Sequence, residues 1–117
     1  MTDKARLGRV EVSPVAIAGL ATAAVLECYG VVGMAHPTLR DGLAGILQRD
    51  HHRRGVQVRV AEQQIIIDLY VILEYGVRIS EVTHNIMEYV KFSVEKALGV
   101  PLHQVNVHVQ GLRISSK

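Results

Sequence analysis

The stretch from Gly55 to Gly76 constrains the fold most, because its apolar residues alternate with polar ones. In GVQVRV, Val56, Val58 and Val60 point one way, and IIIDLYVILEYG continues an alternating pattern after a short turn at EQQ. Such alternation is typical of a strand with one buried face. Two runs of this kind joined by a short turn predict a long β-hairpin.

Helical and strand patterns flank this hairpin. PVAIAGLATAAVL predicts a helix that begins at Ser13-Pro14 and ends at Gly30, because serine caps free N–H groups and glycine permits the closing turn. RISEVTHNIMEYVKFSVEKALG has apolar residues at helical spacing, with Ser80 as the expected cap and Gly99 as the end. VVGMAHP predicts a short strand, TLRDGLAGILQRD a short amphipathic helix, and HQVNVHVQGLRI a final strand.

This order of elements predicts an α+β domain of two layers. A small three- to four-stranded sheet would carry the two main helices on one face. With 117 residues in total, we expect a single domain over residues 10–114, preceded by a flexible basic arm over residues 1–9. The other sheet face is expected to be solvated with an apolar centre, and so a candidate contact surface. It would carry Arg59, Ile66, Asp68, Tyr70, Ile72, Glu74, Asn106 and His108.

The first helix is apolar nearly all round, with only Thr22 and Glu27 clearly polar. Such a helix is either packed within the fold or covered by a partner, and packing within the domain is the favoured interpretation. Its 13 apolar residues are too few to span a bilayer, which takes about 20. Self-association through this helix or the open sheet remains open.

The residues that could carry chemistry do not form a recognisable site. No two of the six histidines stand at the spacing that places two imidazoles on one helix face, and Cys28 lies on an apolar helix. Asp68 and Glu74 share a strand face without a visible pocket or third group. We therefore expect no catalytic residue, no metal, no cofactor and no enzymatic activity.

The same residues indicate a compartment. A lone cysteine allows no intramolecular disulfide, and the charged first residues, MTDKARLGR, lack the apolar segment of a signal peptide. Both features favour a cytoplasmic protein, with any membrane connection made through a partner.

QRDHHRRGVQVRV gathers arginines and histidines, and two interpretations remain open. It is an exposed charged turn, at most a recognition element for a protein partner, or it is the basic loop, residues 49–54, of a small KH-like nucleic-acid-binding module. GVVG from Gly30 to Gly33 matches the G-x-x-G loop of KH domains, but the match is short and unspecific. The exposed turn is favoured, since a net charge of +2 is small. The candidate interaction residues are Arg49, His51, His52, Arg53, Arg54, Arg59, Tyr70, Ile72 and His108.

Four segments in order resemble the alkaline shock protein family of small bacterial stress and cell-envelope proteins. They are VEVSPVAIAGLATAAVLECYGVVGM, RGVQVRV, IIIDLYVILEYGVRISEV and VEKALGVPLHQVNVHVQGL, which together cover roughly residues 10–112. The hairpin turn AEQQ and the HHRR run depart from the family pattern. The resemblance implies a non-enzymatic cytoplasmic protein that acts through protein–protein contact, sometimes near the membrane through a partner, in envelope homeostasis or general stress response.

Overall fold

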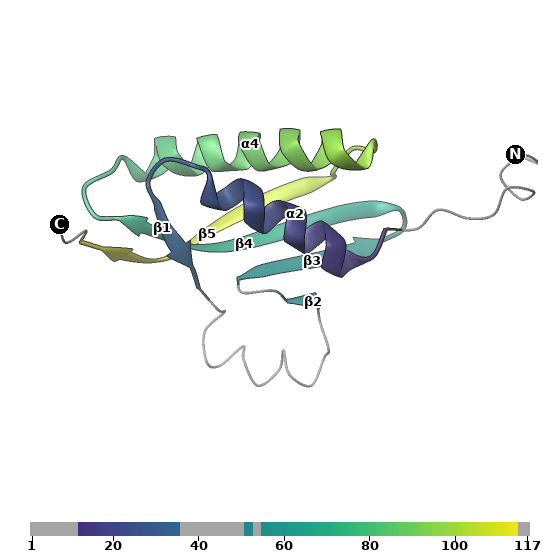
Figure 1. Ribbon diagram of the computed structural model, residues 1–117, viewed down its shortest axis with the longest axis horizontal. Coiled ribbons are helices and arrows are strands. Elements are labelled where there is room, and N and C mark those ends of the chain that lie inside the picture. The colour runs from purple at the N-terminus through teal and green to yellow at the C-terminus, as the bar shows by residue number, and fades with distance from the viewer. Residues whose placement is uncertain (1–11, 36–50, 53–54, 115–117) are drawn as a thin grey trace, which may run out of the picture.

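The computed structural model describes residues 12–35, 51–52 and 55–114. The elements in order are α2 (Pro14–Leu26), β1 (Val31–Met34), β2 (His51–His52), β3 (Val56–Ala61), β4 (Gln64–Glu74), α4 (Ile79–Leu98) and β5 (Gln104–Arg113). Figure 1 shows α2 lying across β3 and β4, with α4 running on the β5 side. The predicted arm over residues 1–9 and the predicted short helix over residues 38–50 lie outside the described residues.

The strand β4 is the centre of the sheet. It pairs in parallel with β5, and antiparallel with β3 through its first half and with β1 through its second half. Tyr70 O accepts from Ala35 N, just after β1, and Tyr70 N donates to Gly55 O, just before β3. The strands β1 and β3 therefore lie one after the other along the same edge of β4. Together with the two-residue β2, which pairs with β3, the described part of the chain forms a sheet of five strands.

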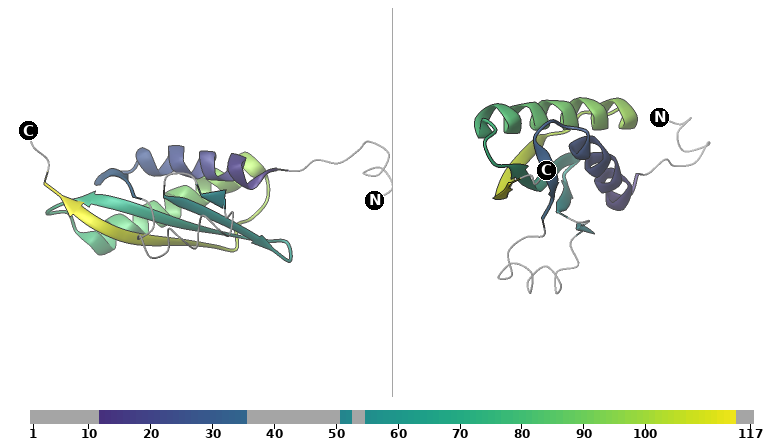
Figure 2. Two further views of the ribbon diagram at one scale, coloured as in Figure 1. Left: turned by 90° about the horizontal axis from the view of Figure 1, so that it is seen from below. Right: turned by 60° about the vertical axis from the view of Figure 1, so that its left-hand side comes forward.

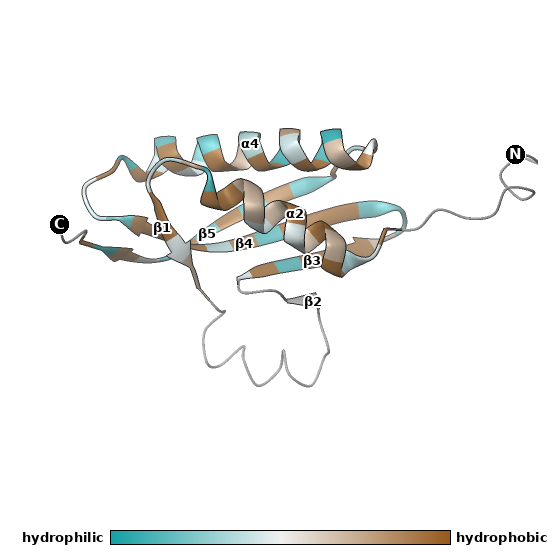
Figure 3. Cartoon of the chain, in the orientation of Figure 1, coloured by the Kyte–Doolittle hydropathy of each residue, from teal (hydrophilic) through white to brown (hydrophobic). Residues whose placement is uncertain are grey.

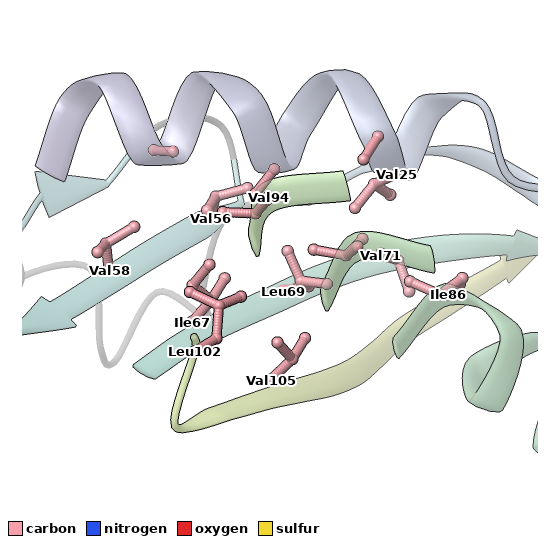
Figure 4. Packing of buried hydrophobic residues seen from close by; sticks show 14 of the residues in the cluster. Val25, Val56, Val58, Ile67, Leu69, Val71, Ile86, Val94, Leu102 and Val105 are labelled. Carbon is pink, nitrogen blue, oxygen red and sulfur yellow. The ribbon is translucent and has the colours of Figure 1, made fainter. Parts of the chain in front are cut away.

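The core lies between the sheet and the two helices (Figure 4). It takes alternate residues of β3 and β4 and one face of each helix, as the binary pattern predicted. Figure 2 shows the two helices beside each other from two further directions. The α+β class and the two helices on one sheet face are therefore confirmed. The largest fully buried side chains are Ile17, Val25, Val56, Ile67, Leu69, Val71, Leu73, Ile86, Val90 and Val94.

The helix ends were partly predicted. Ser13 caps α2 by accepting from Ala16 N at 3.1 Å, as expected. The end at Gly30 is wrong: α2 stops at Leu26, and Gly30 lies in the turn to β1 with φ of +87°. Ser80 does not cap α4, because the cap position is Arg78, whose side chain makes no capping bond; Gly99 closes that helix in the left-handed conformation, as predicted.

The prediction from this packing concerns Gly55, at the start of β3. Its φ is +94°, and an added Cβ would lie 2.5 Å from Ala35 O and 2.9 Å from Tyr70 O. Both obstacles are backbone atoms of the central pairing and cannot move aside. Gly55→Ala should therefore lower the free energy of unfolding by more than about 2 kcal/mol in urea denaturation.

The matched control is Gly76→Ala. Gly76 has a similar φ of +101°, but an added Cβ would meet nothing within 4 Å. This variant should show only the conformational cost of about 1 kcal/mol. Equal losses for the two variants would contradict the steric account of Gly55.

Candidate interaction surface on the open face of the sheet

The most unusual side chain of the open face is Asp68, in the middle of β4. It points away from the helices, since Ile67 and Leu69 on either side of it face the core. Asp68 is nevertheless only 5% exposed. The face was expected to be solvated around an apolar centre, and for Asp68 this expectation is wrong, because its carboxylate is buried under neighbouring side chains.

Three side chains from both neighbouring strands satisfy this carboxylate. Arg59 on β3 donates through Nη2 to Oδ2 at 2.7 Å. On β5, Asn106 Nδ2 donates to Oδ1 at 3.0 Å, and His108 Nε2 lies 3.1 Å from the same oxygen. Because an ionised carboxylate only accepts, His108 must carry its proton on Nε2 to bond here. A buried charge with this number of donors is stabilised where it lies.

This network also fixes the direction of His108. Its ring stacks on Tyr70, with ring centroids 4.6 Å apart and an interplanar angle of 14°. The Nδ1 atom makes no hydrogen bond to any residue that the structure describes. The side chain is half exposed, so a histidine held by a carboxylate and an aromatic ring presents an acceptor to the solvent in its neutral form.

Two opposing effects set the pKa of Asp68. Burial raises it, but the hydrogen bonds from Asn106, His108 and Arg59, together with the charge of Arg59, outweigh burial and hold the pKa below its ordinary value of 3.8. Asp68 is therefore ionised at neutral pH, and it acts as an anchor for its neighbours rather than as a general acid.

The structure brings together four of the predicted interaction residues. Arg59, Tyr70, Ile72 and His108 share the open face, on three adjacent strands. His51 and His52 form β2 at the outer edge of β3, while Arg49, Arg53 and Arg54 lie outside the described residues. The sequence placed Asn106 and Asp68 on this face but did not identify their bond. The bond follows from the register, in which these two residues are direct partners.

The other candidate groups do not assemble into a site. Cys28 is half buried at the end of α2, and burial, followed by the charge of Glu27, raises the pKa of its thiol. Within residues 12–35, 51–52 and 55–114, no three histidine, cysteine or carboxylate side chains lie close enough to hold a metal ion. None of the described helices is both long enough and apolar enough to cross a bilayer.

Comparison with known proteins gives a family match over nearly the whole chain. The sequence model of the alkaline shock protein family, described as having a cell envelope-related function, matches residues 2–114. The chain is 42% identical over 114 residues to the uncharacterized protein YloU of Bacillus subtilis, covering 97% of this chain and 95% of that one. It is 38% identical over 108 residues to the uncharacterized protein Spy1614 of Streptococcus pyogenes, covering 92% and 89%.

Solved structures share the fold at low sequence identity. A MamM variant aligns with a TM-score of 0.54 and 17% identity, covering 86% of this chain and 99% of that one. A variant of the MamM C-terminal domain aligns with a TM-score of 0.53 and 16% identity, covering 86% and 94%. At this identity, the similarity establishes the architecture alone.

The Asp68 network predicts a stability that depends on pH. Because the pKa of Asp68 is lowered by folding, its contribution is fully present above the unfolded value near 3.8 and is lost as the pH falls through the lower folded pKa. Asp68→Asn should cost about 1–3 kcal/mol at neutral pH, since it removes the charge that three donors share. Urea unfolding should show that the difference in the free energy of unfolding between wild type and Asp68→Asn becomes smaller below about pH 4.

Glu62→Gln is the matched control. Glu62 is an exposed carboxylate in the β3–β4 turn, so its removal should change the stability by less than about 0.5 kcal/mol. The difference in stability between wild type and Asp68→Asn could instead stay constant down to pH 2, about two units below the ordinary pKa of an aspartate. That result would contradict the stabilising role of the ionised Asp68 carboxylate.

Proposed function

Because the chain belongs to the alkaline shock protein family, whose description is a cell envelope-related function, we propose that it is a non-enzymatic interaction or scaffold protein of the bacterial cytoplasm. Its role would lie in cell-envelope homeostasis or the general stress response. The open sheet face would be the contact surface, and a protein would be the partner. A membrane-anchored partner would place the protein near the envelope.

The observation that carries this proposal is the fixed arrangement of the open face. Asp68 holds His108 and Arg59, and His108 in turn stacks on Tyr70. Side chains that are already held in one conformation lose little entropy when a partner binds. His108 bonds to an ionised carboxylate that three side chains share, an arrangement that holds the ring in place. This combination supports recognition over catalysis.

The open face also carries an apolar residue with little beside it. Ile72 is paired with Gly33 on β1 and with Gly111 on β5, so it stands between two residues without side chains. An added Cβ at either glycine would meet nothing within 4 Å. Ile72 therefore has no side chain directly beside it on either neighbouring strand, and the stacked Tyr70–His108 pair lies two residues away along β4. Aromatic side chains are enriched at the centre of protein interfaces.

The nucleic-acid alternative has less support. Gly30 to Gly33 leads into β1 and pairs with β4, whereas the corresponding loop of a KH domain joins two helices. The centre of the open face is also close to neutral, because Arg59 is paired with Asp68. A surface that binds phosphates needs uncompensated cations.

Affinity capture from a lysate of the source bacterium, with and without nuclease, tests the proposal. Wild-type protein should retain a stoichiometric protein partner after nuclease treatment, and Tyr70→Glu should lose it, because a charge replaces the aromatic anchor of the face. The affinity for the purified partner should fall about a hundredfold or more. Circular dichroism should show that the variant is still folded.

The matched control is Val60→Glu, which places the same charge at an exposed site near the end of β3 on the helix side of the sheet. It should keep the partner. Equal binding by Tyr70→Glu and wild type would sink the sheet-face proposal. Recovery that collapses on nuclease treatment, and that Arg53→Glu with Arg54→Glu also abolishes, would assign the protein to the nucleic-acid class.

A further inference from the structure

The strand β5 has one edge that no described strand covers. It pairs with β4 on one side, and within residues 12–35, 51–52 and 55–114 no strand pairs with its other side. From Gln104 to Gln110 its valines alternate with uncharged polar residues, and Figure 3 shows β5 with both brown and teal segments. Native edge strands usually carry lysine, proline or an early bulge, because an open edge accepts another strand. This stretch has neither lysine nor proline, and the bulge in its pairing comes after Val109.

The backbone groups on the uncovered edge belong to valines. Tyr70 directs its N–H and its C=O toward β3 and β1, so Leu69 and Val71 on either side of it direct theirs toward β5. In a parallel pair, such a residue bonds to the residues before and after its partner, and the partners here are Val107 and Val109. The polar residues of β5 therefore bond to β4, and the valines direct their N–H and C=O groups outward. These valines are Val105, Val107 and Val109.

The helix side of this edge is apolar. The side chains of Val107 and Val109 are only partly buried against the core. Met87 of α4 is 36% exposed. It lies about 100° around the helix from the buried Ile86, on the flank opposite to Tyr89, which bonds to the end of α2. A strand added to the edge would therefore place every second side chain beside apolar groups.

The open-face side of the edge is polar and uncharged. Gln104 Nε2 donates to Asn106 Oδ1 at 2.8 Å, and Asn106 and His108 both bond to Asp68. In its neutral form His108 presents Nδ1 as an acceptor. The alternate side chains of an added strand would lie beside these groups, where a hydroxyl can donate to Nδ1.

We propose that the uncovered edge of β5 binds an extended segment of a partner protein by strand addition. In this segment apolar residues alternate with uncharged polar ones, so that the apolar residues face Val107 and Met87 and the polar ones lie beside His108. A row of outward N–H and C=O groups is matched by another extended backbone, and this mode of binding recurs in peptide recognition. The edge borders the open face but is a separate surface.

The position of α4 disfavours a second copy of the chain as the occupant. The backbone of α4 lies closer to β5 than to β4. Antiparallel pairing of two β5 strands about a two-fold axis would set both α4 helices on the same side of one continuous sheet. The paired strands would be about 5 Å apart, whereas packed helices need about 8–10 Å between their axes. A single strand without a helix of its own avoids this collision.

Amide hydrogen exchange followed by NMR tests the proposal on the whole chain. The probe is a five-residue peptide, acetylated and amidated, in which valine alternates with threonine. N-methyl groups on both threonines leave one edge free and prevent the peptide from pairing with itself. Saturating probe should slow exchange at Val107 and Val109 by about tenfold or more. The amides of Asn106 and His108, which bond to β4, are the internal control and should keep their rates.

Two matched comparisons isolate the backbone bonds. The same peptide methylated at every residue keeps its side chains but has no N–H to donate between residues, so it should bind about tenfold more weakly or worse. Val107→Pro should abolish binding, because proline lacks the outward N–H but is tolerated on an edge strand. Val107→Ala keeps the N–H and should lose less than about threefold. The peptide comparison uses the wild-type chain, so it does not depend on the folding of Val107→Pro.

The proposal would be overturned by a probe that does not bind, by equal binding of the two peptides, or by valine amides that are already protected without probe. Protection that instead grows with protein concentration alone would assign the edge to a second copy. Tyr70→Glu should keep the probe, because the outward groups are the backbone of β5. Partner capture therefore tests the open face, and probe binding tests the edge.

Discussion

The structure depends on β4, because β1, β3 and β5 all pair with it directly. One side of this strand supplies the largest part of the sheet's contribution to the core, through Ile67, Leu69, Val71 and Leu73. The other side contains Asp68, whose charge is tolerated only where donors reach it from both neighbouring strands. A shift of β5 by one residue would turn Asn106 and His108 toward the helices and leave the carboxylate with Arg59 alone. The polar network and the apolar residues of β5 therefore favour the same register.

Much of the fold could be predicted from periodicity. The hairpin, α4 and β5 follow from alternation of period two and from the helical repeat, and each predicted segment overlaps the observed one. Boundaries were less predictable. Gly30 is left-handed as expected, but the backbone N–H of Glu27 already bonds to carbonyls of the last turn, so α2 ends before the glycine. Ser80 fits the composition of a cap, yet the chain enters the helix at Arg78.

The sequence predicts which residues share the open face of the sheet, but it does not predict the hydrogen bonds that join them at Asp68. Alternation alone places Asp68, Tyr70 and Ile72 on one side of β4. It does not reveal that β5 returns parallel to β4, because that depends on how the α4 crossover packs, nor that residue 106 stands opposite residue 68. Without this register, a lone aspartate on an exposed face is expected to be solvated. The pairing of β1 beside β3 on the same edge of β4, which leaves Ile72 between two glycines, was equally invisible in the sequence.

Packing on the sheet explains only part of the apolar composition of α2. A helix that only covered a sheet would need one apolar side and could carry charged residues on its outer surface, as α4 does between its exposed apolar side chains. In α2 the buried side uses Ile17, Ala21 and Val25, and this contact does not require Val15, Leu20 or Leu26 to be apolar. Polar residues at these exposed positions would cost the fold little. The exposed apolar residues of α2 are therefore not required by packing within the domain, and they lie on the opposite side of the domain from the face that Asp68 organises.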